Sequence, residues 1–497
     1  MPNSQRTRPD PHSAVLPPAR TRFLRRALAC LAAALIAAPI TMLSTASPAA
    51  AETNPTDASK FKGVNWAVPR DNFVHGDVVP EGLNSSDSYD TVKAKANAIL
   101  SGFQSTLGAN TVRLPINTHS VPGTTWGDKY TGAIDAATAK GFKVILSYWE
   151  DEAAQGGRIT NMAAFNSMWN SVIGKYGSNS LVYFEPMNEP HGYSATDWAN
   201  LAATWITDRP SVPKNRIIVS GDGYNDDVTT VCADSRLDGT YLSLHHYAFN
   251  KQEKTYDGWV TEFKSKVGTC GTRTILDEFG APMDDGLNYN DATSINNFVR
   301  YLRADTDTAR SLGMGAVYWP ALGGKHIDRP AYDWYSLFDL EGSGTNLVLG
   351  VRNFSGIDRL KHAWGSDPGS NPSILRNVGS NGCLDVPLGQ NNVQVQVYAQ
   401  CWGGDNQQWT RTPSGQITVY SGTNKKCLDA YGAGIKNGTL VGTYDCNGGA
   451  NQKWMFYSDG TIRTVQAPNI CLDRDGATSK VQLWSCWGSN NQKWQTS

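Results

Sequence analysis

Two glutamates, each at the end of a strand-like run, carry the chemistry that this sequence suggests. Glu189 lies in residues 181–190 (LVYFEPMNEP), and Glu278 lies in residues 272–280 (TRTILDEFG). Two carboxyl groups about 5 Å apart can cleave a glycosidic bond with retention of configuration, because one protonates the leaving oxygen while the other attacks the anomeric carbon. We predict that Glu189 is the acid/base and Glu278 the nucleophile. Glu185 is a rival acid, although no Asn precedes it.

Positioning two carboxyl groups so distant in sequence requires a fold that brings them together. Between residues 61 and 364, short apolar runs alternate with helix-like stretches, the pattern of a parallel α/β barrel. In such a barrel the carboxyl ends of the strands form the catalytic face. We predict an α/β fold, a (β/α)8 TIM barrel, with strands at residues 61–65, 110–115, 143–148, 181–185, 216–220, 241–245, 274–277 and 315–319.

Five motifs follow these predicted strands in order. They are Arg113 in NTVRLP on the second strand, Asn188-Glu189-Pro190 after the fourth, His245 and Tyr247 after the sixth, Glu278 after the seventh, and Trp319 on the eighth. Together they resemble glycoside hydrolase family 5, the large cellulase family of retaining (β/α)8 enzymes. The resemblance implies the two glutamate roles, no cofactor and no metal, and substrate binding by Arg113, Asn188, His245, Tyr247 and Trp319.

The charges of these residues suggest how the two glutamates differ. Arg113 and the Tyr247 hydroxyl should hold the pKa of Glu278 low, so that it is ionised for attack. Burial and the negative Glu278 should keep a proton on Glu189. Two alternatives remain: Arg113 as a buried ion-pair partner without a catalytic role, and His245 as a core histidine.

One position departs from the family pattern. Many members carry a His after the third strand, where this sequence has Trp149, followed by the acidic residues 150–152. We predict that Trp149 binds substrate, and the lost His places ordinary cellulose specificity in doubt. Trp66, Trp126 and Tyr148 are further candidates for stacking on sugars, with a core position as the alternative.

The amino end has the features of a secretory signal. Several arginines precede an apolar run at residues 27–43, and the small residues SPAAA end at residue 51. We predict that residues 1–51, with Cys30, are a cleaved signal peptide, and that the protein is secreted, extracellular and free of the membrane after cleavage. A retained membrane anchor is the alternative. The lysines are scattered rather than clustered, so we predict no nucleic-acid partner.

The carboxyl-terminal part of the sequence repeats. Cys383-Leu-Asp385, Cys427-Leu-Asp429 and Cys471-Leu-Asp473 recur every 44 residues, and each copy ends in Asn-Gln-x-Trp. Three copies imply a threefold unit. It resembles the ricin-type β-trefoil lectins, carbohydrate-binding module family 13. We assign residues 52–365 to the barrel, 366–373 to a linker and 374–497 to the trefoil.

The lectin resemblance implies one sugar pocket in each repeat. Each pocket would combine an Asp and an Asn for the sugar hydroxyls with an aromatic ring for its apolar face. The sets are Asp385, Tyr398 and Asn406; Asp429, Tyr444 and Asn451; and Asp473, Trp484 and Asn491. The first set departs from the others because Tyr398 lies three residues, rather than two, before the second cysteine.

Eight cysteines follow the predicted signal peptide, and an exported chain keeps disulfides. The spacing favours pairing within each repeat and across the sixth barrel strand, although sequence does not establish connectivity. The expected pairs are Cys232 with Cys270, Cys383 with Cys401, Cys427 with Cys446, and Cys471 with Cys486. A zinc site is the alternative, but no Cys-x-x-Cys motif occurs.

These features predict a secreted, monomeric, retaining glycosidase that degrades a polysaccharide, resembles an endo-β-1,4-glucanase and holds a carbohydrate ligand on its lectin module. Two alternatives stay open. One is an exo-acting or hemicellulose-type enzyme for mannan, galactan or arabinan. The other is a carbohydrate-binding protein that has lost catalysis.

Overall fold

The computed structural model describes residues 56–69, 75–249, 251–325, 334–366, 371–387 and 391–497. All of them belong to one compact unit that begins at Thr53. The predicted signal peptide, with Cys30, and part of the predicted linker lie outside the described residues. Among the described residues, no helix combines the length and the apolar character that crossing a membrane requires.

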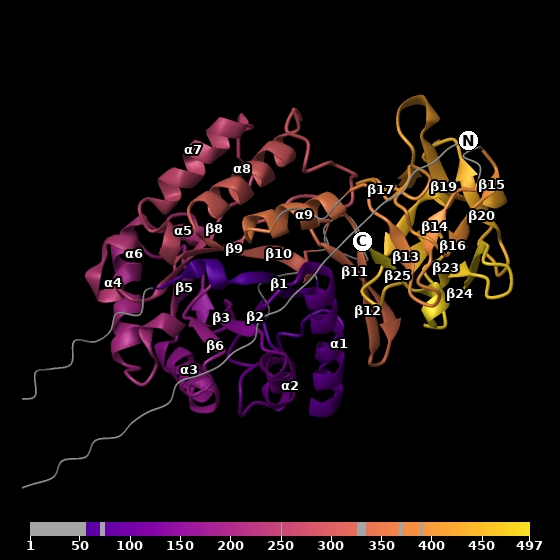
Figure 1. Ribbon diagram of the computed structural model, residues 1–497. Coiled ribbons are helices and arrows are strands. Elements are labelled where there is room, and N and C mark those ends of the chain that lie inside the picture. The colour runs from indigo at the N-terminus through magenta and orange to yellow at the C-terminus, as the bar shows by residue number, and fades with distance from the viewer. Residues whose placement is uncertain (1–55, 70–74, 250, 326–333, 367–370, 388–390) are drawn as a thin grey trace, which may run out of the picture. The chain divides into compact units, whose positions relative to one another are not determined.

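Eight parallel strands form the barrel predicted from the sequence (Figure 1). Their order around the sheet is β6-β3-β2-β1-β10-β9-β8-β7, and a bridge between Phe184 and Ile217 connects the two outermost strands. The eight predicted strands are confirmed to within a few residues at their ends. They are β1 (Lys62–Pro69), β2 (Thr111–Ile116), β3 (Lys143–Tyr148), β6 (Val182–Glu185), β7 (Ile218–Ser220), β8 (Tyr241–His245), β9 (Thr274–Glu278) and β10 (Gly315–Gly324).

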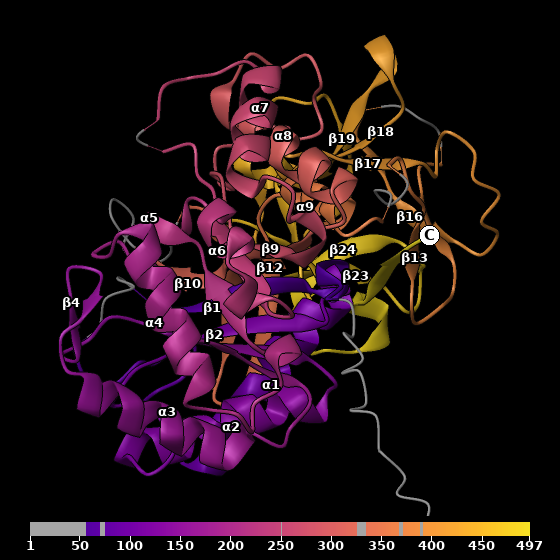
Figure 2. The ribbon, with the colours of Figure 1, turned by 90° about the vertical axis from the view of Figure 1, so that its left-hand side faces the viewer.

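Helices surround the ring of strands (Figure 2). Most begin at a Ser, Thr or Asn whose side chain accepts a hydrogen bond from a backbone N–H of the first turn, which satisfies a donor that the helix itself leaves unpaired. The helices are α1 (Tyr89–Leu107), α2 (Thr125–Ala139), α3 (Met162–Tyr176), α4 (Ala195–Thr207), α5 (Asp222–Asn225), α6 (Thr229–Ala233), α7 (Tyr256–Val267), α8 (Asn297–Ser311) and α9 (Phe354–Ala363).

The two ends of the barrel interior differ in chemistry. At the amino ends of the strands, Phe61 meets Tyr183 and Tyr241 edge to face, each with ring centroids 4.9 Å apart. These rings fill the bottom of the barrel. The carboxyl ends instead bury polar side chains such as Arg113, Glu185 and Asp277. Because aromatic rings fill the amino ends and polar side chains gather at the carboxyl ends, the functional site is expected at the carboxyl ends.

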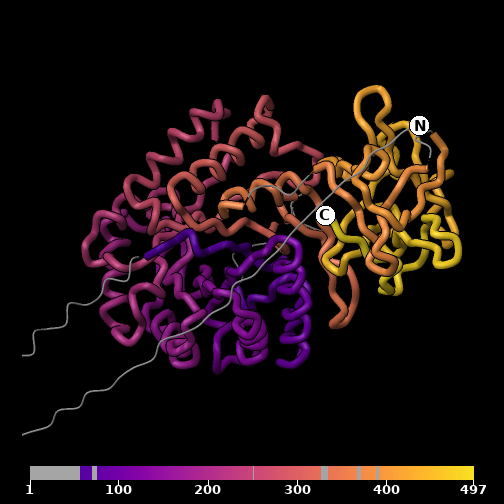
Figure 3. Tube along the Cα trace, in the orientation of Figure 1, coloured from indigo at the N-terminus to yellow at the C-terminus, as the bar shows by residue number. Residues whose placement is uncertain are grey.

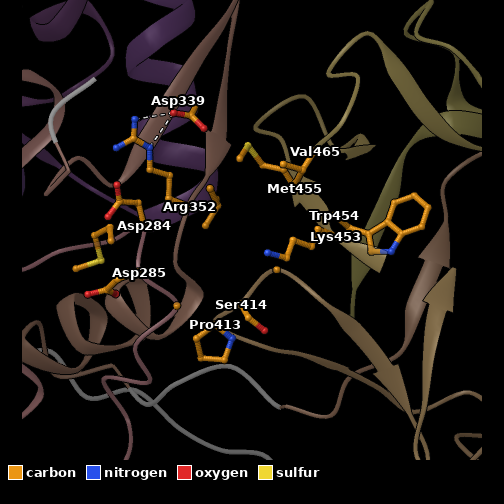
Figure 4. A pocket seen from close by; sticks show the side chains of 14 residues that line it. Asp284, Asp285, Asp339, Arg352, Pro413, Ser414, Lys453, Trp454, Met455 and Val465 are labelled. Atoms are coloured by element: carbon orange, nitrogen blue, oxygen red, sulfur yellow. Dashed lines mark hydrogen bonds and ion pairs between the residues drawn. The ribbon is translucent and has the colours of Figure 1, made fainter. Parts of the chain in front are cut away.

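Two β-hairpins lie outside the eight-stranded sheet of the barrel. The short pair β4 (Ala154–Gln155) and β5 (Arg158–Ile159) follows β3, and β11 (Phe338–Ser343) pairs with β12 (Asn346–Val351) after β10. Arg352, just after β12, points to Asp339 on β11 and donates from Nε to its Oδ1 at 2.8 Å (Figure 4). This ion pair fastens the open end of the second hairpin.

The chain then continues into three β-rich repeats. They form the orange-to-yellow end of the trace (Figure 3). Their core contains Trp409, Trp454 and Trp494, and each indole N–H donates to the carbonyl of the Leu in its Cys-Leu-Asp motif, at 2.9, 3.0 and 3.0 Å. The predicted β-trefoil is confirmed. Its strands are β13 (Leu375–Asn377), β14 (Cys383–Asp385), β15 (Val393–Gln394), β16 (Gln396–Tyr398), β17 (Trp409–Arg411), β18 (Ile417–Val419), β19 (Lys426–Ala430), β20 (Val441–Tyr444), β21 (Trp454–Phe456), β22 (Ile462–Thr464), β23 (Ile470–Arg474), β24 (Val481–Ser485) and β25 (Trp494–Thr496).

The four predicted disulfides are confirmed. Cys232 bonds Cys270 in the barrel, and one bond lies in each trefoil repeat: Cys383 with Cys401, Cys427 with Cys446, and Cys471 with Cys486. The barrel bond joins the end of α6 to the segment before β9, and so it encloses β8.

We predict that replacing Cys232 and Cys270 together by Ser lowers the free energy of unfolding of the barrel by about 2–4 kcal/mol, because the unfolded chain gains the freedom that the cross-link removes. Urea denaturation followed by tryptophan fluorescence measures the change. An unfolding midpoint equal to that of the wild type would contradict the prediction.

Candidate active site

Glu189 and Glu278 face one another at the carboxyl ends of the barrel strands. Each has an oxygen within 4.8 Å of the other and of a ring nitrogen of His245. Glu278 ends β9, and its side chain is 5% exposed, whereas the Glu189 side chain is 19% exposed. The sequence motifs therefore identified two carboxyl groups that the fold brings together.

The turn that carries Glu189 has an unusual backbone. Glu189 has a φ of 50°, in the left-handed region that non-glycine residues seldom adopt. Two hydrogen bonds fix this turn: Asn188 N–H donates to the Tyr148 carbonyl at 2.7 Å, and Glu189 N–H donates to Asn225 Oδ1 at 3.0 Å. Backbone strain of this kind persists where the surrounding structure holds it, which is common at functional sites.

Arg113 lies at the centre of the site with its side chain 1% exposed. Its Nη1 donates to Glu278 Oε1 at 2.5 Å, and its Nη2 donates to Asn188 Oδ1 at 2.6 Å. Its Nε and Nη2 also make a bidentate pair with Glu185, at 2.7 and 3.1 Å. Arg113 thus contacts the predicted nucleophile and the turn of the predicted acid directly, as well as forming a buried ion pair.

His245 is a second cation between the two glutamates. Its Nδ1 lies 3.0 Å from Glu189 Oε1 and 3.5 Å from Glu278 Oε2, and its Nε2 lies 3.3 Å from Asp277 Oδ1. Burial by itself would lower the pKa of His245, but the negative charges of Glu278 and Asp277 and the hydrogen bonds to Asp277 and Glu189 raise it to about 10. His245 therefore carries a proton at neutral pH, and a protonated imidazole donates hydrogen bonds rather than binding a metal.

The pKa of Glu278 is shifted in the direction opposite to the one expected from the sequence. Burial raises the pKa of Glu278 above its ordinary value, and the nearby His245 and Arg113 oppose that effect without overcoming it. The expected lowering was wrong, because Arg113 shares its charge with Glu185 and Asp277 and because Glu278 is removed from water. Tyr247 supports the ionised form as predicted, since its hydroxyl donates to Glu278 Oε2 at 3.0 Å.

Glu185 is not placed as an acid that could reach a substrate. Its side chain has no solvent exposure and pairs with Arg113. The rival assignment of Glu185 as the acid is therefore wrong, and its role is to hold the Arg113 guanidinium.

Asn225 and Ser243 belong to the site although no sequence motif marked them. Asn225 is fully buried, has a φ of 55° and donates from Nδ2 to Ser243 Oγ at 2.5 Å. Ser243 in turn donates to Asp277 Oδ1 at 2.6 Å. These bonds connect the turn of Glu189 to the strand of Glu278. The only sequence signal was an Asn among turn-forming residues, which is too common to identify a site.

The aromatic candidates divide into two groups. Trp66, Trp126 and Tyr148 are buried in the core of the barrel, so they are not sugar-stacking surfaces. Trp149 and Trp319 are also buried, at 2% and 6% exposure, but they pack against each other in a separate small cluster that Tyr247 contacts, with ring centroids 5.3 Å apart. Tyr247, which donates to Glu278, links this cluster to the site, and contact of the two Trp rings with substrate stays a prediction.

The three predicted trefoil pockets share one hydrogen-bond pattern. Oδ2 of each Asp accepts from the Asn of its repeat, at 2.8 Å for Asp385, 2.8 Å for Asp429 and 2.6 Å for Asp473. The aromatic residues are about equally exposed, at 40%, 39% and 39% for Tyr398, Tyr444 and Trp484. Each stands opposite the first cysteine of its repeat in the strand register. The one-residue offset before Cys401 therefore does not displace Tyr398.

Comparison with known proteins gives one family match for the barrel and another for the trefoil. Residues 79–322 match the family model Cellulase (glycosyl hydrolase family 5), and residues 372–494 match the Ricin-type beta-trefoil lectin domain. The chain contains a family 5 cellulase domain and a ricin-type lectin domain. The two domains correspond to the barrel and to the trefoil.

Individual relatives resemble one domain each. The chain is 26% identical over 210 residues to a probable endo-beta-1,4-glucanase B of Neosartorya fischeri, covering 38% of this chain and 61% of that protein. It is 39% identical over 75 residues to a seed lectin of Trichosanthes anguina, covering 15% of this chain and 14% of that protein. The chain thus spans less than two thirds of the length of either relative.

Among solved structures, Cel5A (EG2) from Hypocrea jecorina is 17% identical with a TM-score of 0.42, and the match covers 64% of this chain and 99% of that one. The fold of the family 5 domain rests on its own strand order and on the family match, rather than on this likeness.

We predict that His245 stabilises the folded protein most strongly below pH 6.5. Its pKa is about 10 in the folded state and about 6.5 in an unfolded chain, so its contribution is complete below the lower value and is lost as the pH rises through the upper one. The difference in unfolding free energy between the wild type and His245→Asn should therefore shrink from pH 6.5 to 10, by at most about 1.4 kcal/mol per pH unit. Urea titrations of both proteins across this pH range test the prediction. A difference in unfolding free energy that stays constant with pH would refute it.

Proposed function

We propose that the protein is a secreted retaining glycoside hydrolase that cleaves a polysaccharide and resembles an endo-β-1,4-glucanase. The observation that carries the proposal is the placement of Glu189 and Glu278, with oxygens within 4.8 Å and a cationic His245 between them. Retaining glycosidases separate their two carboxyl groups by about 5–5.5 Å, whereas inverting enzymes need about 6.5–9.5 Å to admit a water molecule. The short separation therefore favours retention.

In the first step, Glu278 attacks the anomeric carbon while Glu189 gives its proton to the leaving oxygen. Arg113 and Tyr247 orient the two oxygens of Glu278 through hydrogen bonds of 2.5 and 3.0 Å. In the second step, Glu189 takes a proton from water, whose oxygen displaces Glu278 from the sugar. His245 stabilises the negative charge that appears on Glu189 after its proton has left.

Asn188 suits a contact with the sugar ring. Its Oδ1 already accepts a hydrogen bond from Arg113, so its Nδ2 group is the part that can donate to a ligand. A donor to the sugar 2-hydroxyl strengthens its bond in the oxocarbenium-like transition state, which speeds the reaction.

Two features bear on the substrate. The likeness of the barrel to a probable endo-beta-1,4-glucanase supports a β-1,4-glucan. Trp149 stands where many family members have a His, and it packs on Trp319. This change favours an exo-acting or hemicellulose-type enzyme, for mannan, galactan or arabinan, as the second candidate.

The lectin domain would hold the enzyme on its polymer. We place it in carbohydrate-binding module family 13, with the barrel at residues 52–365, the linker at 366–373 and the trefoil at 374–497. Four disulfides suit an extracellular protein, which we propose is a monomer exported by residues 1–51. A module of modest affinity raises the local concentration of substrate without changing the chemistry.

The first test compares the wild type with Glu278→Ala and Glu189→Gln on glucans, mannans, xylans, galactans and arabinans. We expect the wild type to release sugars from one polymer with retained configuration, seen by proton NMR, and Glu278→Ala to lose roughly a thousandfold or more in turnover. Azide should restore turnover of an aryl glycoside in Glu278→Ala and yield the inverted glycosyl azide.

The matched control is Glu152→Gln. Glu152 comes after strand β3, at the same end of the barrel, but its side chain is 51% exposed. Inverted products from the wild type, or full turnover in Glu278→Ala, would disprove the retaining assignment. If the wild type releases sugars from none of the polymers, that result would favour a carbohydrate-binding protein without catalysis.

A second prediction concerns the trefoil. Replacing Asp429 and Asp473 together by Ala should weaken retention on the insoluble polymer by roughly tenfold or more, because each change removes a charged hydrogen-bond acceptor from a pocket. Hydrolysis of short soluble oligosaccharides should continue. Sedimentation binding assays measure retention, with the exposed trefoil residue changed in Lys436→Ala as control. Equal retention by the double variant would contradict the assignment of these pockets.

A further inference from the structure

The pairing of β8 with β9 is irregular where the two strands carry the site. Leu244 pairs with Leu276, but the next residue, His245, pairs with Glu278, so the register shifts by one residue, as at a β-bulge. A bulge interrupts the regular ladder of main-chain hydrogen bonds and re-aims the neighbouring side chains. The relative position of the two strand ends therefore depends on contacts from outside the ladder.

One side chain of α8 bonds to both strand ends. The Tyr301 hydroxyl donates to the His246 carbonyl at 2.5 Å and accepts from the Gly280 N–H at 3.3 Å. His246 directly precedes Tyr247, and Gly280 comes shortly after Glu278. Tyr301 thus joins the turn that carries Tyr247 to the turn that carries Glu278.

Tyr301 is fully buried, so it does not itself touch a substrate. Its ring meets Trp259 edge to face with centroids 5.4 Å apart, and it lies tilted against His246 at 5.8 Å. This packing fixes the direction of the hydroxyl group. Both hydrogen-bond partners of the hydroxyl are buried backbone groups, and such groups are costly to leave without a partner.

The same face of α8 also holds the His246 ring. Asp305 lies one helical turn after Tyr301, and its Oδ2 is 2.8 Å from His246 Nδ1, with neither side chain exposed to solvent. On the other side of the ring, His246 Nε2 lies 3.5 Å from Glu262 Oε1, on the neighbouring helix α7 (Figure 1). Two helices thus hold the imidazole, which keeps the His246 backbone where Tyr301 meets it.

The two joined turns carry the two partners of one catalytic hydrogen bond. The Tyr247 hydroxyl donates to Glu278 Oε2 at 3.0 Å, and this bond requires that the two turns keep their spacing. We propose that Tyr301 is a positioning residue that holds Tyr247 and the proposed nucleophile Glu278 in hydrogen-bonding contact. The inference rests on the proposed retaining function.

A loss of this positioning should slow attack without weakening binding. Arg113 holds Oε1 of Glu278 and Tyr247 holds Oε2, so the carboxylate keeps one orientation while both bonds are present. With the second bond weakened, the carboxylate can turn, and it spends less time in the geometry from which it attacks the anomeric carbon. The sugar itself makes no contact with the buried Tyr301, so its affinity should not change.

The test uses 2,4-dinitrophenyl 2-deoxy-2-fluoro-β-cellobioside. Glu278 bonds to its anomeric carbon, dinitrophenolate leaves with the bonding electrons and without help from an acid, and the sugar stays on the enzyme. The rate constant at saturation reports attack by Glu278, and the half-saturating concentration reports binding. We expect Tyr301→Phe to lower this rate constant about tenfold, the scale of one buried hydrogen bond, with the half-saturating concentration unchanged.

The readout distinguishes positioning from folding. Intact-protein mass spectrometry counts the labelled sites, so a misfolded fraction lowers the final amount of label and not the rate constant. The matched control is Tyr176→Phe, because Tyr176 is another buried helical tyrosine, and its hydroxyl donates to Asp135 at 3.2 Å. This control should keep the rate constant of the wild type.

A double variant tests the route through Tyr247. If Tyr301 acts by holding the bond between Tyr247 and Glu278, its hydroxyl should matter little once that bond is gone. In the Tyr247→Phe background, Tyr301→Phe should therefore lower the rate constant by no more than about twofold.

The outcomes separate the positioning role from the proposed function. A wild-type rate constant in Tyr301→Phe, a change confined to the half-saturating concentration, or an equal fold-loss in both backgrounds overturns the role of Tyr301 alone. A wild type that releases no dinitrophenolate and takes up no label overturns the proposed retaining β-glucanase function, and the positioning role with it. A loss in Tyr301→Phe that disappears in the Tyr247→Phe background, with Tyr176→Phe unchanged, supports the role.

Discussion

The active site depends on one buried guanidinium. Arg113 extends from β2 into the middle of the barrel, where it meets Glu185, Asp277 and Glu278 and the side chain of Asn188. Burying so many carboxylates without a cation would be very costly, and burying the cation without them equally so. The network is therefore cooperative: Arg113 holds β6, β9 and the Glu189 turn at fixed distances, and each of these partners holds Arg113.

A single cation does not balance this many acids, and His245 supplies the second. It lies between Glu189 and Asp277, while Arg113 lies between Glu185 and Glu278. The two predicted catalytic groups consequently face different surroundings. Glu278 is buried and held by Arg113 and Tyr247, whereas Glu189 is more exposed and opens onto a pocket that Tyr224 also lines. Different surroundings for two like groups are the usual way in which a protein assigns them different roles.

Much of this arrangement could be predicted from the sequence. The eight strands are short apolar runs of the kind that any α/β barrel shows. His245 and Glu278 end β8 and β9, Arg113 lies on β2, and Glu189 follows β6, so the topology of the barrel brings them to one face. The trefoil could be predicted equally well, because the Cys-Leu-Asp and Asn-Gln-x-Trp motifs recur in its three repeats.

What could not be predicted depends on side chains that meet only after folding. Asn225 comes from an irregular segment after β7, and its path decides that Oδ1 reaches the Glu189 N–H. The pKa of Glu278 likewise depends on how completely it is buried and on how many acids share Arg113. Neither the burial nor the sharing is encoded in a motif around residue 278, which is why the expected direction was wrong.

The trefoil shows the same limit on a smaller scale. Opposite the pocket Asp in the strand register stand Gln396 in the first repeat and Gln482 in the third, and each donates to Oδ1 of its Asp, at 3.0 and 3.2 Å. The second repeat has Gly442 at this place, where a side chain would collide with the hydroxyl of Tyr431. Asp429 therefore lacks the glutamine that donates to Oδ1 of the Asp in the other two repeats. Three copies of one motif thus have unequal surroundings, because the residue that differs lies on the neighbouring strand rather than in the repeated motif.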